Sequence, residues 1–217
     1  MLAYFKDYES INPELRDRVK KMTQTRETRM RQLIERVNEV IPDRFQGKII
    51  FENVKRAAEG VLARPHLARE MVKLGIVSST GQAFERYLVK YNVERENLDA
   101  PVAISMVRES GGVPVLAHPG ERSYSLICPE KGRQPENVPI LLEELKEMGL
   151  LGLECHYPYH ERIGTVDYFI DLANSFNLIV TGSRDFHGFN SHQKASIFGT
   201  TKMEPVFLEQ FQKVWAA

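Results

Sequence analysis

The chain has few cysteines and no excess of charge of either sign. Its 217 residues include two cysteines, Cys128 and Cys155, which is too few for a disulfide framework and in keeping with a reducing cytoplasm. Lysines and arginines number 29, as do aspartates and glutamates. The net charge is therefore zero, and no overall field attracts nucleic acid. Any phosphate must be bound by local arginines.

Long apolar runs are also missing. No run approaches the length of a membrane-spanning helix, and residues 1–7 lack the basic-then-apolar pattern of a signal peptide. We expect a cytoplasmic protein without a membrane partner, of a length that suits one domain with a sizeable core.

The first half of the chain is predicted to be helical. Asn12 and Pro13 predict the start of a long helix, because proline fits the first helical position. Pro42 predicts its end near Val40. Apolar residues recur along this helix at spacings of three and four, with one gap: Leu15, Val19, Met22, Met30, Leu33, Val37 and Val40.

Arg26 and Arg29 lie at that gap. At about 100° per residue both fall on the face that should be buried, where unpaired charges are costly. Two interpretations stay open: the pair snorkels or forms an internal salt bridge, or its guanidinium groups clamp a phosphate. Arg31 should point outward into solvent.

Residues 10–95 show helical patterns without strands, so this region resembles an insertion or cap. Arg64 and His66 lie at a predicted helix start, where backbone N–H groups favour anions. The shorter helices predicted here are 51–63, one that begins at Pro65 and ends near Gly75, and 80–89.

From Asp99 onward, strands alternate with helices, which indicates an α/β fold with a parallel sheet or barrel. The predicted strands are 113–117, 150–155 and 178–181. The predicted helices are 101–110, 138–148, 165–176 and 205–215.

Polar side chains follow all three predicted strands. His118 follows the first, and Asp185 and His187 follow the third. Around the end of the second lie Glu154, His156 and His160. Carboxyl ends of parallel strands form the reactive face of such folds, and imidazole with carboxylate suits zinc, manganese or iron. Each motif alone more often makes a turn or a helix cap, but their joint occurrence favours a metal site.

Four segments resemble the polymerase-and-histidinol-phosphatase (PHP) superfamily, nearest to its nucleoside 3′,5′-bisphosphate phosphatases and a related 5′-to-3′ exoribonuclease: ARPHLAREMVKLGIVSSTGQAFERYL, GGVPVLAHPG, GLECHYPYH and TGSRDFHG. The resemblance covers essentially the whole chain. It implies a distorted (β/α)₇ barrel with a helical insertion and up to three divalent metal ions at its C-terminal face. We expect Mn²⁺ first, with Zn²⁺, Fe²⁺ or Mg²⁺ as alternatives.

The resemblance also implies residue roles. His118, Asp185 and His187 resemble metal ligands, and the latter two are the expected catalytic residues. His187 should also approach the scissile phosphate. The other residues expected to contact substrate phosphates are Arg26, Arg29, Arg64 and His66.

Two features depart from the family. Arg184 stands before Asp185 where serine is usual. Residues 2–5 resemble the segment that follows the family's first half-site, and the His-x-His motif that should precede them occurs nowhere in the chain. We therefore expect the C-terminal portion of a PHP enzyme, organised as a single domain over 1–217, a helical insertion over 10–95 and an incomplete barrel over 96–217.

The expected function is metal-dependent hydrolysis of phosphate esters in small nucleotides or RNA 5′ ends, since a neutral chain suits duplex DNA less well. The alternative is a truncated or degenerate chain without independent catalysis, which acts as a binding or assembly module or as half of a split enzyme. The expected partners are a phosphorylated small molecule, nucleotide or RNA 5′ end, together with an N-terminal segment or complementary chain that supplies the missing ligands.

Overall fold

The computed structural model describes residues 1–58, 60–94, 97–121, 126–128, 132–186 and 198–216. The chain forms two compact units. The first contains Met1–Leu15 and Leu98–Ala217, and the second contains Arg16–Asn97. The second unit lies close to the limits expected for the helical insertion, while the assignment of the whole chain to one PHP-type domain stays a prediction.

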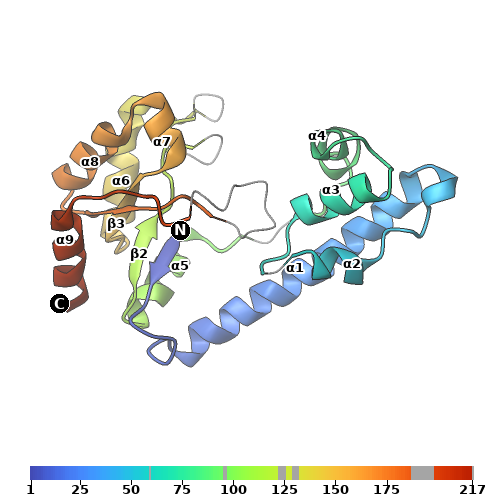
Figure 1. Ribbon diagram of the computed structural model, residues 1–217. Helices are drawn as coiled ribbons and strands as arrows, with labels where there is room; N and C mark the ends of the chain where they lie inside the picture. Colours follow the sequence, from blue (N-terminus) through green and yellow to red (C-terminus); the bar gives the residue numbers. More distant parts are fainter. Residues whose placement is uncertain (59, 95–96, 122–125, 129–131, 187–197, 217) are drawn as a thin grey trace. The chain divides into compact units, whose positions relative to one another are not determined.

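The first unit has a mixed α/β fold (Figure 1). The predicted strands and helices of this unit are confirmed with ends within two residues, whereas β1 and α7 were not predicted. Its described elements are β1 (Leu2–Tyr4), α5 (Ala100–Glu109), β2 (Val113–Leu116), η5 (Pro135–Asn137), α6 (Val138–Glu147), β3 (Gly152–His156), α7 (Pro158–Ile163), α8 (Val166–Ser175), β4 (Ile179–Gly182) and α9 (Pro205–Ala216).

The strands form one sheet in the order β1-β2-β3-β4. β2, β3 and β4 are parallel, with Gly152 paired to both Val115 and Ile179. β1 runs antiparallel to β2, with Leu2 opposite Val115. The predicted parallel pairing is confirmed for β2, β3 and β4, and β1, which was not predicted, adds an antiparallel strand at the edge of the sheet.

Alternate residues of the strands enter two apolar clusters, as expected when successive side chains point to opposite faces. On one face, Leu153, Cys155 and Val180 pack with side chains of α5, α6 and α8. On the other, Val115 and Ile179 pack with Phe211 and Val214 of α9, among others. Cys155 is fully buried and packs as a small apolar residue.

The second unit is helical in its described part. α1 (Pro13–Val40) confirms the predicted long helix, although it begins in the first unit. The remaining elements are η1 (Asp43–Phe45), α2 (Phe51–Arg56), α3 (Arg64–Lys73), α4 (Thr80–Ala83) and η2 (Phe84–Leu88), a π-helical turn that continues α4.

Two helical predictions need correction. The helix expected at 51–63 ends at Arg56, before Gly60, which would be costly inside a helix. On the apolar stripe of α1, Leu15, Met30, Leu33 and Val37 are buried, and the last three join side chains of α2 and α3 in one core. Val19 and Val40 are 53% and 38% exposed, so the stripe is not buried along its full length. Within the described residues, no helix is both long and apolar enough to cross a membrane.

Gly152 lies where β3 passes between β2 and β4, and it leaves no room for a side chain. A Cβ there would lie 2.9 Å from the Ile179 carbonyl oxygen and 2.6 Å from its Cγ1. We predict that Gly152→Ala lowers the free energy of unfolding by about 1–3 kcal/mol, because the backbone contact cannot rotate away. Circular dichroism during urea unfolding measures this.

The matched control is Gly81→Ala. Gly81 lies in α4, and a Cβ added there would have the Ser79 Oγ as its nearest neighbour, at 3.8 Å. Alanine should leave stability unchanged or raise it by about 0.5–1 kcal/mol. Equal effects of the two substitutions would show that the close strand spacing at Gly152 is not a constraint.

Candidate active site at the strand ends

The carboxyl ends of β2, β3 and β4 lie at one edge of the sheet, because the three strands are parallel. His118 follows β2, Glu154 lies near the end of β3, and Ser183 and Asp185 follow β4. Hydrogen bonds join these segments across 29 to 36 residues of sequence.

Glu154 connects the outer two of these strand ends. Its side chain is 2% exposed. Oε2 accepts the backbone N–H of His118 at 2.8 Å, and Oε1 accepts the hydroxyl of Ser183 at 2.6 Å. Ser183 Oγ in turn accepts the backbone N–H of Asp185 at 3.0 Å. One buried carboxylate thus holds both segments that carry predicted metal ligands.

His118 and Asp185 share an uncommon backbone conformation. Their φ angles are 29° and 49°, in the left-handed region that residues other than glycine seldom adopt. Such conformations persist where the surroundings impose them, and they gather at functional sites. Here the hydrogen bonds from Glu154 and Ser183 hold the two backbone segments.

Tyr157 lies between two further carboxylates. Its hydroxyl donates to Glu121 and lies 3.4 Å from Asp185 Oδ2, while its ring centroid is 5.0 Å from that of His118. Burial raises the pKa of Tyr157 well above its usual value, and the bond to Glu121 and the charge of Asp185 add to this. The phenol therefore stays protonated and donates its one proton to Glu121, with Asp185 Oδ2 as a more distant second acceptor.

His160 supports the loop after β2. It is fully buried; its Nε2 accepts the N–H of Gly120 at 3.0 Å, and Nδ1 lies 2.8 Å from the Cys155 carbonyl oxygen, to which it donates in the matching tautomer. Its ring stacks on Phe169 at 4.4 Å between centroids. Both ring nitrogens are occupied by the protein itself, so His160 has a structural role.

The remaining residues predicted near this edge have different positions. His187 lies outside the described residues. Arg184, the departure from the family pattern, forms an ion pair with Glu161 and also donates to the Thr200 carbonyl oxygen. His156 stacks near Phe207 of α9, and its buried Nε2 has no hydrogen-bond partner in the described part of the chain.

The donor types at this edge suit a divalent cation. His118 supplies an imidazole, and the carboxylates of Glu121 and Asp185 converge on one hydroxyl, which concentrates negative charge there. Within the described residues, however, no three histidine, cysteine, aspartate or glutamate side chains are placed to hold an ion together. Any complete site therefore needs donors besides these.

Sequence reasoning assigned no role to Glu121 or Ser183. Ser183 directly follows β4, so its place at a strand end was a usable signal. Glu121 lies in a loop, and only the fold brings it to Tyr157.

The predicted phosphate-binding residues belong to the second unit. Arg29 and Arg64 meet at the side-chain oxygen of Asn92, at 2.8 and 3.3 Å, and Arg29 also donates to the Val93 carbonyl oxygen. Arg26 is half-buried on α1. The two arginines are thus brought together by Asn92, a residue that sequence reasoning did not select.

His66 caps its own helix: Nδ1 lies 3.0 Å from both the N–H and the carbonyl oxygen of Ala63. Arg31 is exposed as expected, over the ring of Phe51 and 3.4 Å from Glu52.

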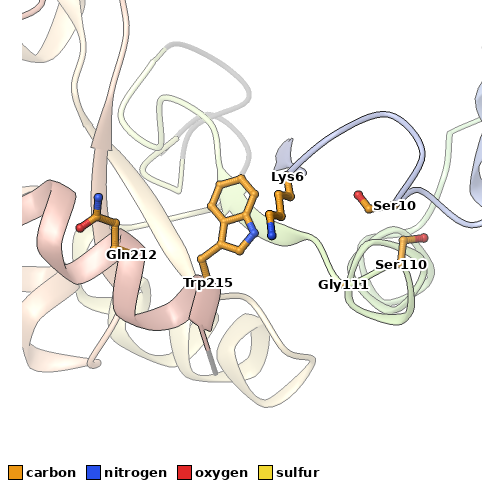
Figure 2. Close-up of a pocket in the computed structure, with 6 residues that line it drawn as sticks. All are labelled: Lys6, Ser10, Ser110, Gly111, Gln212 and Trp215. Carbon is orange, nitrogen blue, oxygen red and sulfur yellow. The ribbon is translucent and has the colours of Figure 1, made fainter.

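One pocket of the first unit lies away from the strand-end residues. It has a volume of about 650 Å³, and Figure 2 shows its lining by Lys6, Ser10, Ser110, Gly111, Gln212 and Trp215. Ser110 and Gly111 precede β2, whereas His118 follows it. The pocket therefore lies at the opposite end of that strand, and the chemistry of the carboxyl ends does not depend on it.

No family model matches the chain. Among curated proteins, the chain is 31% identical over 117 residues to a 5′-3′ exoribonuclease of Haemophilus influenzae, a match that covers 52% of this chain and 40% of that protein. It is 36% identical over 92 residues to a phosphoribosyl 1,2-cyclic phosphate 1,2-diphosphodiesterase of Eggerthella lenta, which covers 42% of this chain and 29% of that protein. The chain thus spans well under half the length of these relatives.

Two solved structures share the fold over 94% of the chain. One is a candidate metal-dependent phosphoesterase of Bifidobacterium adolescentis, with a TM-score of 0.69, 22% identity and 67% of that chain covered. The other is an amidohydrolase of Chromobacterium violaceum with bound sulfate and no metal, with a TM-score of 0.68, 20% identity and 68% covered. The resemblance to the PHP superfamily is confirmed.

His160 allows a test of the structural support for the loop after β2. Burial lowers the pKa of His160 below its usual 6.5, although the bond to the Cys155 carbonyl and the charges of Glu154 and Glu121 oppose this. As pH falls through about 6.5, the unfolded chain takes up a proton that the folded ring does not, so the stability of the folded state must fall.

We predict that His160→Gln lowers the free energy of unfolding by about 1–3 kcal/mol at pH 8, because buried backbone groups lose well-aligned partners. The gap between wild type and variant should narrow towards pH 5.5. Urea unfolding at several pH values measures both quantities. A gap independent of pH would contradict a neutral, buried His160.

Proposed function

We propose that this chain is part of a metal-dependent phosphoesterase that acts on small nucleotides or RNA 5′ ends. The observation that carries the proposal is the polar cluster at the strand ends, where His118 and Asp185 lie around Tyr157 and are positioned through Glu154. Two relatives support this reaction class, because one is named an exoribonuclease and the other a diphosphodiesterase.

In this proposal, His118, Asp185 and His187 hold divalent metal ions, with Mn²⁺ preferred. Bound ions would polarise the phosphoryl group and lower the pKa of a water molecule. The chain's own residues orient this arrangement: Tyr157 donates to the carboxylate of Glu121 and lies 3.4 Å from that of Asp185. His187 also approaches the phosphate, and Asp185 and His187 act as the catalytic pair.

The phosphate groups of the substrate are proposed to bind Arg26, Arg29, Arg64 and His66. Asn92 holds Arg29 and Arg64 side by side, which preorganises two forked guanidinium groups for a phosphate. Arg26 lies one helical turn before Arg29 on α1 and is half-buried. A cytoplasmic location is part of the same proposal.

The architecture proposed for the first unit is an incomplete (β/α)₇ barrel. Three parallel strands that alternate with helices along the chain support it. We further propose that other metal donors come from a preceding segment or a complementary chain that carries the His-x-His motif. The length of the curated relatives supports a larger whole enzyme.

The direct test combines metal binding with hydrolysis. Mn²⁺ binding by electron paramagnetic resonance, and release of phosphate or nucleotide from a nucleoside 3′,5′-bisphosphate and a 5′-phosphorylated RNA, are measured for wild type and Asp185→Asn. We predict that Asp185→Asn weakens Mn²⁺ binding by more than about a hundredfold, since loss of a ligand should exceed the 10–100-fold cost of losing its supporting partner.

The matched control is Asp171→Asn, an exposed carboxylate on α8, which should bind Mn²⁺ like wild type. Failure of the wild-type chain to bind Mn²⁺, also in the presence of a segment with the His-x-His motif, would overturn the metal assignment. Binding of metal and RNA without hydrolysis, also in the presence of a segment with the His-x-His motif, would favour the binding-module alternative.

The phosphate clamp is tested on α1. We predict that Arg26→Leu weakens binding of the nucleoside 3′,5′-bisphosphate about tenfold, since a charged hydrogen bond contributes about 1.5–3 kcal/mol. Arg31→Leu, on the exposed side of the same helix with Glu52, should leave the affinity unchanged. Isothermal titration calorimetry measures both, and equal affinities for the two variants would remove Arg26 from the substrate site.

A further inference from the structure

We propose that Glu154 is a positioning residue that sets the geometry of both segments carrying His118 and Asp185. The expected effect on metal affinity rests on the proposed function. The positioning role itself rests on hydrogen bonds within the described residues.

The geometry of Glu154 is specific to a carboxylate. Its two oxygens accept from groups on opposite neighbouring strands: the N–H of His118 after β2 and the hydroxyl of Ser183 after β4. An ionised carboxylate is acceptor-only and can serve both donors with charge-assisted bonds. An amide has one acceptor oxygen and would have to reverse the bond to Ser183.

Burial makes the loss of either hydrogen bond to Glu154 costly in free energy. At 2% exposure, a carboxylate is costly unless it is well hydrogen-bonded, so both donors must stay in place while the site is folded. Both segments also carry a residue with positive φ, at 29° for His118 and 49° for Asp185. Loss of Glu154 would release two strained backbone segments at once.

Both segments held by Glu154 carry a proposed metal ligand, so Glu154 should affect metal affinity. Glu154 does not need to touch a metal ion; it orients the backbone of one proposed ligand directly and of the other through Ser183 Oγ, which accepts the N–H of Asp185. Partners that orient ligands in this way typically change metal affinity 10–100-fold when removed.

The experiment uses Glu154→Leu, of similar size but without acceptors. Amide hydrogen exchange read by NMR should rise at least tenfold at both His118 and Asp185, because the His118 N–H loses its acceptor and the Asp185 N–H donates to Ser183 Oγ, which is no longer held by Glu154. Ser183→Ala should raise exchange at Asp185 and leave His118 protected. Mn²⁺ affinity should fall about 10–100-fold in Glu154→Leu.

The matched control is Glu70→Leu. Glu70 is another buried glutamate, 4% exposed, and it pairs with Lys73 in α3 of the second unit. It should leave exchange at His118 and Asp185 and the Mn²⁺ affinity unchanged. If Glu154→Leu fails to fold, Glu154→Gln provides the same readouts, with a smaller rise in exchange and a weaker loss of affinity.

The outcomes separate the two claims. Wild-type exchange at both amides in folded Glu154 variants would overturn the positioning role, whatever the metal does. Raised exchange with unchanged Mn²⁺ affinity would overturn its consequence for the metal. Absence of Mn²⁺ binding in wild type, also when a segment with the His-x-His motif is supplied, would overturn the proposed function, while the exchange pattern still decides whether Glu154 positions both segments.

Discussion

The site depends on the parallel register of β2, β3 and β4. That register brings three carboxyl ends to one edge, so residues 36 positions apart in sequence, such as His118 and Glu154, form a hydrogen bond. Close approach of the strands at Gly152 maintains the register. A shift of β3 by one residue would point Glu154 to the other face of the sheet, and the connection to His118 and Ser183 would be lost.

Two fully buried polar side chains at this edge, Glu154 and His160, each make two hydrogen bonds within the protein. Glu154 accepts from two neighbouring strand ends, and His160 accepts from Gly120 and donates to Cys155. Because an unsatisfied buried donor or acceptor costs about 1–3 kcal/mol, such arrangements are rigid once formed. The edge thus combines a fixed inner layer with an outer layer of Tyr157, Glu121 and Asp185, whose carboxylates can face a cation.

Local sequence signals predicted most of the elements. Proline at helix starts, glycine after helices and the spacing of apolar residues gave α1, α3, β2, β3 and β4 nearly to the residue. These local signals failed where burial or strand direction depends on another element of the fold. Val19 and Val40 fit the apolar stripe of α1 but stay exposed, because a stripe is buried only where another element packs on it. β1 is a three-residue strand whose direction is set by the neighbour it pairs with.

The sequence by itself determined the residue types at the strand ends and the family resemblance, because both reside in short contiguous segments. Only the tertiary structure decided which of these residues are engaged in hydrogen bonds within the protein. His160 and Glu154 read as equal candidates in the sequence, yet the structure uses both nitrogens of the one and both oxygens of the other within the protein. The physical reason is that a hydrogen bond depends on distance and direction in space, and strand pairing alone supplies these between distant segments.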